Sequence, residues 1–311
     1  MPQRWFKLGV IELSIGGQPH ERENMKNQKK NNKAALLFLA PSLAGFLLFY
    51  LLPFLSGAYY SLVDSPVGGR FTGLSNYIAL LSNPVFLKAA NNTLVFTFIS
   101  VPLIMLCSLC LAILLNKGIY IKDALRTSFI TPLVVPVASV VLVWQVIFDL
   151  WGSLNGLLTG LGLDAVDWMN TDWARLVVIV VYLWKNTGYN MVLFLAGLQN
   201  IPVEYYESAN IDGAGSFRKF RSITVIYLTP TAFFVFIISI INSFKVFRET
   251  WLISGSYPQD GIYMLQHYMN NMFASLDYQK LTSAAFIMAA VIYLLVLLLF
   301  RMERRISKSI T

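Results

Sequence analysis

Residues 92–116 read NTLVFTFISVPLIMLCSLCLAILLN and contain no charged side chain. A helix of about 20 mostly apolar residues is long enough to cross the hydrocarbon core of a bilayer. Five further stretches share this character, and their approximate bounds are 34–58, 125–148, 174–198, 223–244 and 283–301. The sequence therefore predicts an all-α integral membrane protein with six transmembrane helices.

The composition of the whole chain also indicates a membrane environment. Of its 311 residues, 56% are hydrophobic and 13% are charged, compared with roughly 25% charged residues in soluble domains. The net charge of +8 does not indicate a nucleic-acid partner, because the basic residues lie beside apolar segments rather than on one amphipathic face. The expected surroundings are membrane lipid.

The distribution of Lys and Arg predicts the orientation of the chain. The segments before span one, between spans two and three, between spans four and five, and after span six together carry 17 of these residues. The opposite segments carry six, and Lys185 lies within span four. Because cytoplasmic loops are enriched in Lys and Arg, both termini are expected in the cytoplasm.

The N-terminal tail, residues 1–33, and the C-terminal tail, residues 303–311, are expected to flank a transmembrane domain over residues 34–302. Residues 1–24 are polar and lack periodicity, and Met25 opens the sequence MKNQKKNNK directly before the first span. We interpret residues 1–24 either as a disordered tail or as the product of a misassigned start.

Motifs for catalysis or energy supply are missing from the sequence. It contains no G-x-x-x-x-G-K-[ST] phosphate-binding loop, and no chain of acidic residues within the spans indicates a proton relay. Neither catalytic residues nor metal ligands are predicted, and the C-x-x-C of Cys107 and Cys110 is interpreted as a packed pair inside an apolar run. Active transport would need energy from another polypeptide.

The segment between spans four and five has clear helix punctuation. Pro202 suits the first turn of a helix, where its missing N–H is not needed. Glu204 is favourable in the same turn, and Gly213 can adopt the positive φ of a C-terminal cap. A second helix is predicted from about Ser216 and continues into span five. We weigh a simple surface loop equally against a docking element for a partner protein.

The residues of this segment carry a family resemblance. The stretch Glu207-Ser208-Ala209, followed by Asp212-Gly213-Ala214, Phe220 and Ile223-Thr224, resembles the EAA loop of ABC importer permeases. It is most similar to the carbohydrate branch, which includes maltose and glycerol-phosphate permeases. Supporting stretches in the same order are GLSNY at 73–77, NTL at 92–94, LRT at 125–127, WKNTG at 184–188 and LAGL at 195–198.

The resemblance implies a type I ABC importer permease fold in the bacterial cytoplasmic (inner) membrane. It also implies that residues 201–230 form a coupling loop on an ABC ATPase, which binds ATP and Mg, so that this chain needs no cofactor of its own. The implied further partners are a second homologous permease and an extracellular solute-binding protein. The implied coupling residues are Glu204, Glu207, Ser208, Ala209, Asp212, Gly213, Ala214, Phe217 and Phe220.

One position departs from the family pattern. The family commonly has Leu-Pro after the Ile-Thr pair, whereas Val225-Ile226 stands here and Pro230 follows four residues later. Because proline kinks a helix, we expect the bend before span five to be smoother than in relatives or displaced towards Pro230.

Polar side chains form stripes on spans four and five. Within each stripe the spacing of three and four residues places the side chains on one helical face. A charged group near the bilayer midplane must face protein or water. We therefore predict a substrate path, with packing between helices or against a partner permease as the alternative. The predicted path residues are Tyr182, Lys185, Asn186, Tyr189, Asn190, Ser239, Asn242 and Ser243.

The leading functional hypothesis is a permease subunit of an ATP-driven, binding-protein-dependent sugar importer, with an oligosaccharide as the expected cargo. One alternative is the same fold moving glycerol phosphate, phosphate or a polyamine. An anionic cargo would favour more cationic residues in the path than the single Lys185. A secondary transporter or a membrane enzyme is the other alternative, and the sequence lacks the ion site or metal motif that either would need.

Overall fold

The computed structural model describes residues 37–117 and 120–310, with their side chains as far as Arg304. The expectations for residues 1–24 therefore concern a part of the chain outside the described residues. The chain divides into two compact units, residues 1–57 and 58–311. The first unit contributes an apolar helix from Leu37 onwards, with a π-helical turn η1 (Leu47–Leu51) and the beginning of α2 (Leu52–Tyr60).

Regular structure in the described residues is helical, apart from one isolated antiparallel bridge between Val63 and Phe71. The helices after α2 are α3 (Ser75–Leu81), α4 (Pro84–Asn116), α5 (Lys122–Val134), α6 (Val137–Phe148), α7 (Ser153–Gly160), α8 (Ala174–Gln199), α9 (Val203–Ile211), α10 (Ser216–Lys219), α11 (Val225–Phe244), α12 (Phe247–Ser254), α13 (Leu265–Ala274) and α14 (Tyr278–Ile310). Two short turns complete the list, the π-helical η2 (Phe220–Thr224) and the 3₁₀ η3 (Asp260–Ile262).

Six helical segments of the described chain are long and apolar enough to cross a membrane, as the sequence predicts. They are Leu37–Tyr60, Pro84–Asn116, Val137–Gly160, Ala174–Gln199, Ser216–Ser254 and Tyr278–Arg304. The second span begins at Pro84 rather than near Asn92, because the Asn83 side chain accepts hydrogen bonds from Val85 N and Phe86 N and caps the helix there.

The prediction of one continuous third span over 125–148 is wrong. The structure divides this stretch into α5 and α6, which are separated at Val135 and Pro136. Val135 has an extended backbone with ψ of 134°. A residue before proline is disfavoured in the helical region because the proline ring clashes with its backbone, so the break follows from Pro136.

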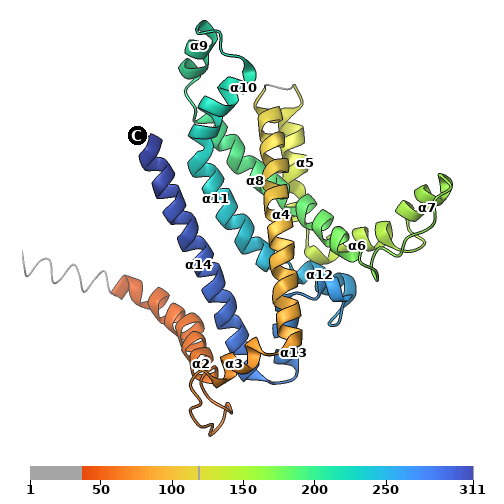
Figure 1. The fold of residues 1–311 in the computed structure, drawn as a ribbon, viewed down its shortest axis with the longest axis vertical. Coiled ribbons are helices and arrows are strands. Elements are labelled where there is room, and N and C mark those ends of the chain that lie inside the picture. Colours follow the sequence, from red (N-terminus) through yellow and green to blue (C-terminus); the bar gives the residue numbers. More distant parts are fainter. Residues whose placement is uncertain (1–36, 118–119, 311) are drawn as a thin grey trace, which may run out of the picture. The chain divides into compact units, whose positions relative to one another are not determined.

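Helix α8 packs against α4, α5 and α11, and these helices form the core of the second unit (Figure 1). Two glycines of α8 permit close approach. A Cβ at Gly188 would overlap the backbone carbonyl of Phe129 in α5, and a Cβ at Gly197 would lie 2.7 Å from the Thr231 hydroxyl in α11. Met191 and Phe194, between these glycines, are buried in the same core. The position of α8 is thus fixed on two sides.

The two ends of this helical unit differ. Helix α9 and α10 lie at one end, which we call the α9 end, and α13 and α3 lie at the other, which we call the α13 end (Figure 1). Residues 249–282 lie between the stretches 223–244 and 283–301 that the sequence predicts as spans, and they are structured. This region contains the end of α12, then η3 and α13, because apolar and aromatic residues such as Ile262, Leu265 and Tyr268 are buried there.

Hydrogen bonds join the η3 region to α4 and α8. The Asn92 side chain donates to the carbonyl oxygens of Asp260 (2.6 Å) and Tyr263 (3.1 Å). Arg175 donates to Gly261 O and to Asn92 Oδ1, each at 3.2 Å. The start of α8 is thereby tied to the segment that leads out of α12.

Candidate functional site

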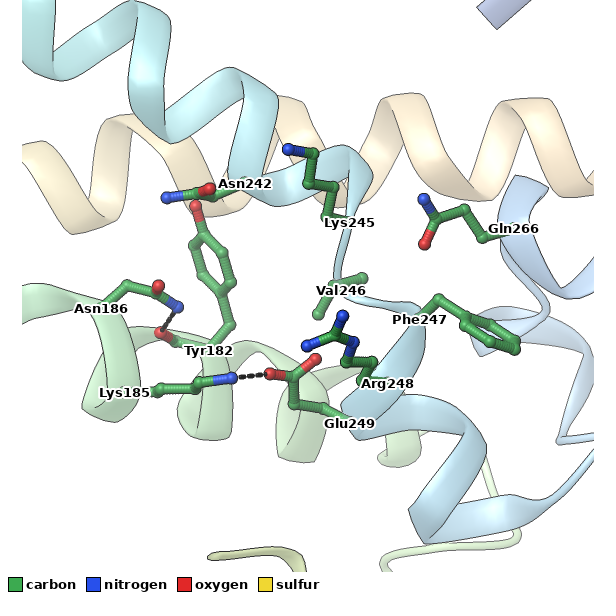
Figure 2. A pocket seen from close by; sticks show the side chains of 10 residues that line it. All are labelled: Tyr182, Lys185, Asn186, Asn242, Lys245, Val246, Phe247, Arg248, Glu249 and Gln266. Carbon is green, nitrogen blue, oxygen red and sulfur yellow. Dashed lines mark hydrogen bonds and ion pairs between the residues drawn. The ribbon is translucent and has the colours of Figure 1, made fainter. Parts of the chain in front are cut away.

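A polar cavity of about 450 Å³ lies beside α8, the C-terminal end of α11 and α12. Figure 2 shows the side chains that surround it. They are Tyr182, Lys185 and Asn186 from α8, Asn242 from α11, Lys245 and Val246 from the connection, Phe247, Arg248 and Glu249 from α12, and Gln266 from α13. The cavity is thus built from segments up to 84 residues apart in the sequence.

Helical spacing explains the α8 wall of the cavity. Lys185 and Asn186 follow Tyr182 by three and four residues, so the three side chains share one face of the helix. The Asn186 side chain donates to the Tyr182 carbonyl oxygen (2.9 Å), which leaves its amide oxygen available to the cavity. Lys185 lies eleven residues from Ala174 and fourteen from Gln199, or about 16 and 21 Å along the helix. The cavity is therefore near the middle of the span.

A turn in the chain builds the opposite wall. Helix α11 ends at Phe244, and α12 begins at Phe247. Val246, at the turn, is 3% exposed and packs in a core with Phe96 and Tyr182. With this anchor in place, Lys245, Arg248 and Glu249 all border the same space as Lys185 (Figure 2).

Lys185 and Glu249 form an ion pair across the cavity wall. Their side chains are only 15% and 8% exposed. Charged groups at this depth in a membrane require a partner or water, and each charge here supplies the other's partner. Sequence reasoning missed Glu249, because it lies outside the predicted spans and its partner lies 64 residues earlier. In the sequence, the one local feature of Glu249 is its position four residues after a basic residue, Lys245.

The remaining basic residues of the cavity are Lys245 and Arg248, and both are exposed. The ion pairs of the described residues are Lys88–Asp260, Lys185–Glu249 and Lys280–Asp277. Neither Lys245 nor Arg248 takes part in these pairs. The cavity lining therefore contains three basic residues and one carboxylate, whereas Lys185 is the single basic residue among the eight predicted path residues.

The eight predicted path residues separate into groups. Tyr182, Lys185, Asn186 and Asn242 line the cavity. Three others are buried between helices: Asn190 donates to Ser239 Oγ (2.8 Å), and Ser243 Oγ bonds Thr97 Oγ1 (2.9 Å). Tyr182 also donates to the Ser239 carbonyl oxygen (3.0 Å). Tyr189 is 36% exposed and does not line the cavity.

The predicted coupling loop has the helical form that its sequence indicates. Helix α9 follows Pro202, carries Glu204 in its first turn and ends before Gly213, whose φ is +72°. The Ala214 N–H donates to the Ala209 carbonyl oxygen (2.8 Å), which closes this end of the helix. The helical path then continues from Ser216 into α11, as predicted.

Most of the nine predicted coupling residues are accessible. Ala209, Ala214 and Phe220 are partly buried, whereas the exposed ones are Glu204, Glu207, Ser208, Asp212, Gly213 and Phe217. Ile211 is 88% exposed and Phe217 76%. The loop is held to the rest of the unit by a hydrogen bond between the Tyr206 and Thr224 hydroxyls (2.9 Å) and by the Tyr205 and Tyr227 rings, 5.0 Å apart. The loop is therefore fixed to the rest of the unit, and the apolar side chains of Ile211 and Phe217 are exposed on it.

The departure from the family pattern at Ile226 leaves the helix intact. The backbone stays helical from Val225 through Pro230 to Phe244. The irregularity falls one turn earlier, in the π-helical turn η2.

Comparisons with known proteins agree with this architecture. The family described as "Binding-protein-dependent transport system inner membrane component" matches residues 104–311. An arabinooligosaccharides transport system permease protein of Bacillus subtilis (strain 168) is 38% identical over 228 residues, which cover 71% of this chain and 72% of the relative. A trehalose/maltose transport system permease protein of Thermococcus litoralis is 33% identical over 242 residues, 76% of this chain and 82% of the relative.

The fold also matches a solved structure. The crystal structure of a bacterial ABC transporter involved in the import of the acidic polysaccharide alginate contains a chain with a TM-score of 0.81 and 23% identity. The match covers 91% of this chain and 99% of that chain. Together with the six spans, the family match shows that this chain is a multi-pass inner membrane permease of the binding-protein-dependent transport system family, the membrane subunits of ABC importers.

Proposed function

We propose that this chain is a permease subunit of a sugar importer, and that its cargo passes the cavity beside α8. The observation that supports this most directly is the cavity itself, which lies near the middle of a span and is lined by the amides of Asn186, Asn242 and Gln266. Amide groups both donate and accept hydrogen bonds, so they match sugar hydroxyls. Relatives whose names specify arabinooligosaccharides, lactose and trehalose/maltose support a saccharide as the cargo.

The α9 end is proposed to face the cytoplasm and to bind an ABC ATPase. Ile211 and Phe217 are large apolar side chains with 88% and 76% exposure, and exposed apolar groups beside polar ones are typical of protein interfaces. The exposed acids Glu204 and Glu207 of α9 add polar contacts. ATP and Mg would bind to that subunit rather than to this chain.

The proposed assembly has two further partners. A second related permease would complete the wall of the cavity, which this chain surrounds on only some sides. A solute-binding protein would deliver cargo to the α13 end; the solved alginate transporter was also obtained in complex with an alginate pentasaccharide-bound periplasmic protein. Alternating access then follows if closure of the ATPases moves α9 together with η2 and α11, to which it is bonded.

Among the alternatives, a polyamine cargo is disfavoured by charge. The cavity lining carries Lys185, Lys245 and Arg248 against one carboxylate, Glu249, and like charges at membrane depth repel strongly because the dielectric is low. Such a lining would raise the energy of a bound polycation.

The proposal is tested by reconstituting the chain with its co-expressed permease, ATPase and binding-protein partners in proteoliposomes. We expect ATP-dependent uptake of labelled oligosaccharides. An Ile211→Asp variant should lose most of the uptake and release the ATPase on purification, because it places a charge in the apolar interface. The matched control is Val67→Asp, since Val67 is 87% exposed but lies in another part of the unit. Uptake without ATP, or equal behaviour of the two variants, would contradict the proposal.

A further inference from the structure

The cavity beside α8 contains more positive charge than its own carboxylate can neutralise. Glu249 is the only acid in the lining, and Lys185 is its ion-pair partner. Lys245 and Arg248 border the same space and form no ion pair within the described part of the chain. The lining therefore contains two more basic side chains than acidic ones.

The depth of the cavity makes this excess important. Lys185 is about 16 Å from one end of α8 and about 21 Å from the other, whereas the hydrocarbon core is about 30 Å thick. Charges in this region are expensive without counter-charges and therefore mark ion or substrate sites by default. The other two acids that form ion pairs, Asp260 and Asp277, bind Lys88 and Lys280 and do not line the cavity.

The two basic side chains without an ion-pair partner in the described residues, Lys245 and Arg248, are suited to binding oxyanions. The Arg248 guanidinium presents a planar set of donors that matches carboxylate, sulfonate or phosphate oxygens. Lys245 adds three donors on a flexible stem. In Figure 2 both side chains approach the space that Tyr182, Asn186 and Asn242 border from the other side. A ligand there would contact cations on one side and neutral donors and acceptors on the other.

The size of the cavity suits a small-molecule ligand. About 450 Å³ falls within the range of about 300–1,000 Å³ that is typical of small-molecule sites. The Phe247 ring and the amide of Gln266 also reach the lining, so the space combines an apolar surface with hydrogen-bonding groups. A short saccharide segment with an acidic substituent satisfies all of these features.

We infer that the cavity selects saccharides that carry an oxyanion group, which Lys245 and Arg248 bind while Asn186, Asn242 and Gln266 bind hydroxyls. This inference rests on the proposed function and specifies its substrate class. Lys185 has a different part: its ion pair holds Glu249 and prevents that carboxylate from neutralising the two other cations.

The test compares two probes with the same sugar backbone, trigalacturonate and its fully methyl-esterified form, in which the esters remove the negative charges. Binding of each to the complete transporter in nanodiscs, without binding protein, is measured by calorimetry at low and high salt. The acid should bind about tenfold or more tightly than the ester, since it gains charge-assisted hydrogen bonds. High salt should reduce this preference.

The variant K245Q/R248Q should lose the preference for the acid, whereas R70Q/K117Q, which removes the same charge from exposed positions outside the cavity lining, should keep it. Equal binding of acid and ester by the unmodified transporter, tighter binding of the ester, or no binding of either would overturn the inference. A preference for the acid that survives in K245Q/R248Q would also overturn the inference.

Failure of this inference can be distinguished from failure of the proposed function. ATP-dependent uptake of neutral oligosaccharides together with equal binding of acid and ester would retain the sugar permease and refute the anionic selection. Absence of uptake for every saccharide, neutral or acidic, would refute the proposed function itself.

Discussion

The polar residues of α8 and α11 occupy two different environments. Asn190, Ser239 and Ser243 are at most 1% exposed and form hydrogen bonds between helices. Asn186 and Asn242, of similar chemistry and on the same helices, are partly exposed and border the cavity. Polarity within a membrane span therefore does not identify a substrate path by itself. What distinguishes the two groups is whether the side chain's hydrogen-bonding capacity is satisfied inside the protein.

The ion pair between Lys185 and Glu249 lies on the border between these environments, and breaking it should have the largest effect. The Glu249→Gln variant leaves the Lys185 ammonium buried without its counter-charge, which typically costs about 3–5 kcal/mol. We expect a clear drop in the thermal unfolding midpoint of the purified transporter.

A control separates charge pairing from packing. Replacing both partners, as in K185M/E249M, removes the unpaired charge and should recover much of the lost stability, because apolar replacements of buried pairs are often neutral. If E249Q unfolded at the same temperature as the unmodified protein, the pair would not contribute as described.

His267 lies in a third kind of environment, where a polar side chain is buried and one of its ring nitrogens lacks a hydrogen-bond partner in the described residues. Its side chain is 0% exposed, its Nδ1 accepts from the Met264 N–H (3.3 Å), and its Nε2 has no hydrogen-bond partner within the described residues. Burial lowers the pKa of His267 from 6.5 to about 4. The ring is therefore neutral at pH 7.

The lowered pKa of His267 predicts an acid-dependent loss of stability. Between about pH 6.5 and pH 4 the unfolded chain binds a proton that the folded chain does not, so stability falls as the pH decreases through this window, by roughly 3 kcal/mol at most. Thermal unfolding of the transporter at about pH 7 and pH 4.5 should show this. The His267→Phe variant should lose less on acidification; an identical loss in both proteins would exclude His267 as the cause.

Single substitutions of the buried and of the cavity-lining polar residues should have smaller effects, and the two kinds of residue should affect different properties. Asn190→Ala removes the hydrogen bond to Ser239 and should lower stability by about 0.6–2 kcal/mol, with uptake reduced only in proportion to the folded protein. Asn186→Leu should lower the rate of uptake while leaving unfolding unchanged. Uptake and thermal unfolding should be measured on the same preparations. If both variants lost only stability, or both lost only uptake, the distinction between buried and cavity-lining residues would be contradicted.

Local sequence signals were sufficient for much of this architecture. Apolar length identified the six spans, and the punctuation by Pro202, Glu204 and Gly213 identified α9, because these effects act within one or two turns. The i, i+3 and i+4 spacing also placed Tyr182, Lys185 and Asn186 on one face. The break at Pro136 was readable in principle, since the residue before a proline resists helical geometry, but the continuous apolar pattern concealed it.

The rest of the site depends on tertiary contacts. The rotation of α8 and α11 against α4 decides which polar residues are packed between helices and which face the cavity. The sequence pattern of one helix does not specify that rotation. The same holds for Glu249, whose partner is 64 residues away and is reached only through the turn between α11 and α12. For the same reason, the sequence pattern shows Lys245 and Arg248 only as charges that flank the spans.

If the cavity beside α8 is a hydrated path, water-soluble thiol reagents should reach cysteines in its lining. In a background with Cys107 and Cys110 replaced by Ser, single cysteines at Asn186, Asn242, Asn190 and Ser243 are treated with a membrane-impermeant, negatively charged methanethiosulfonate in the assembled transporter. We predict rapid modification at 186 and 242, faster than with a cationic reagent, and protection at 190 and 243. Protection at 186 and 242, or equal modification at all four positions, would contradict the account.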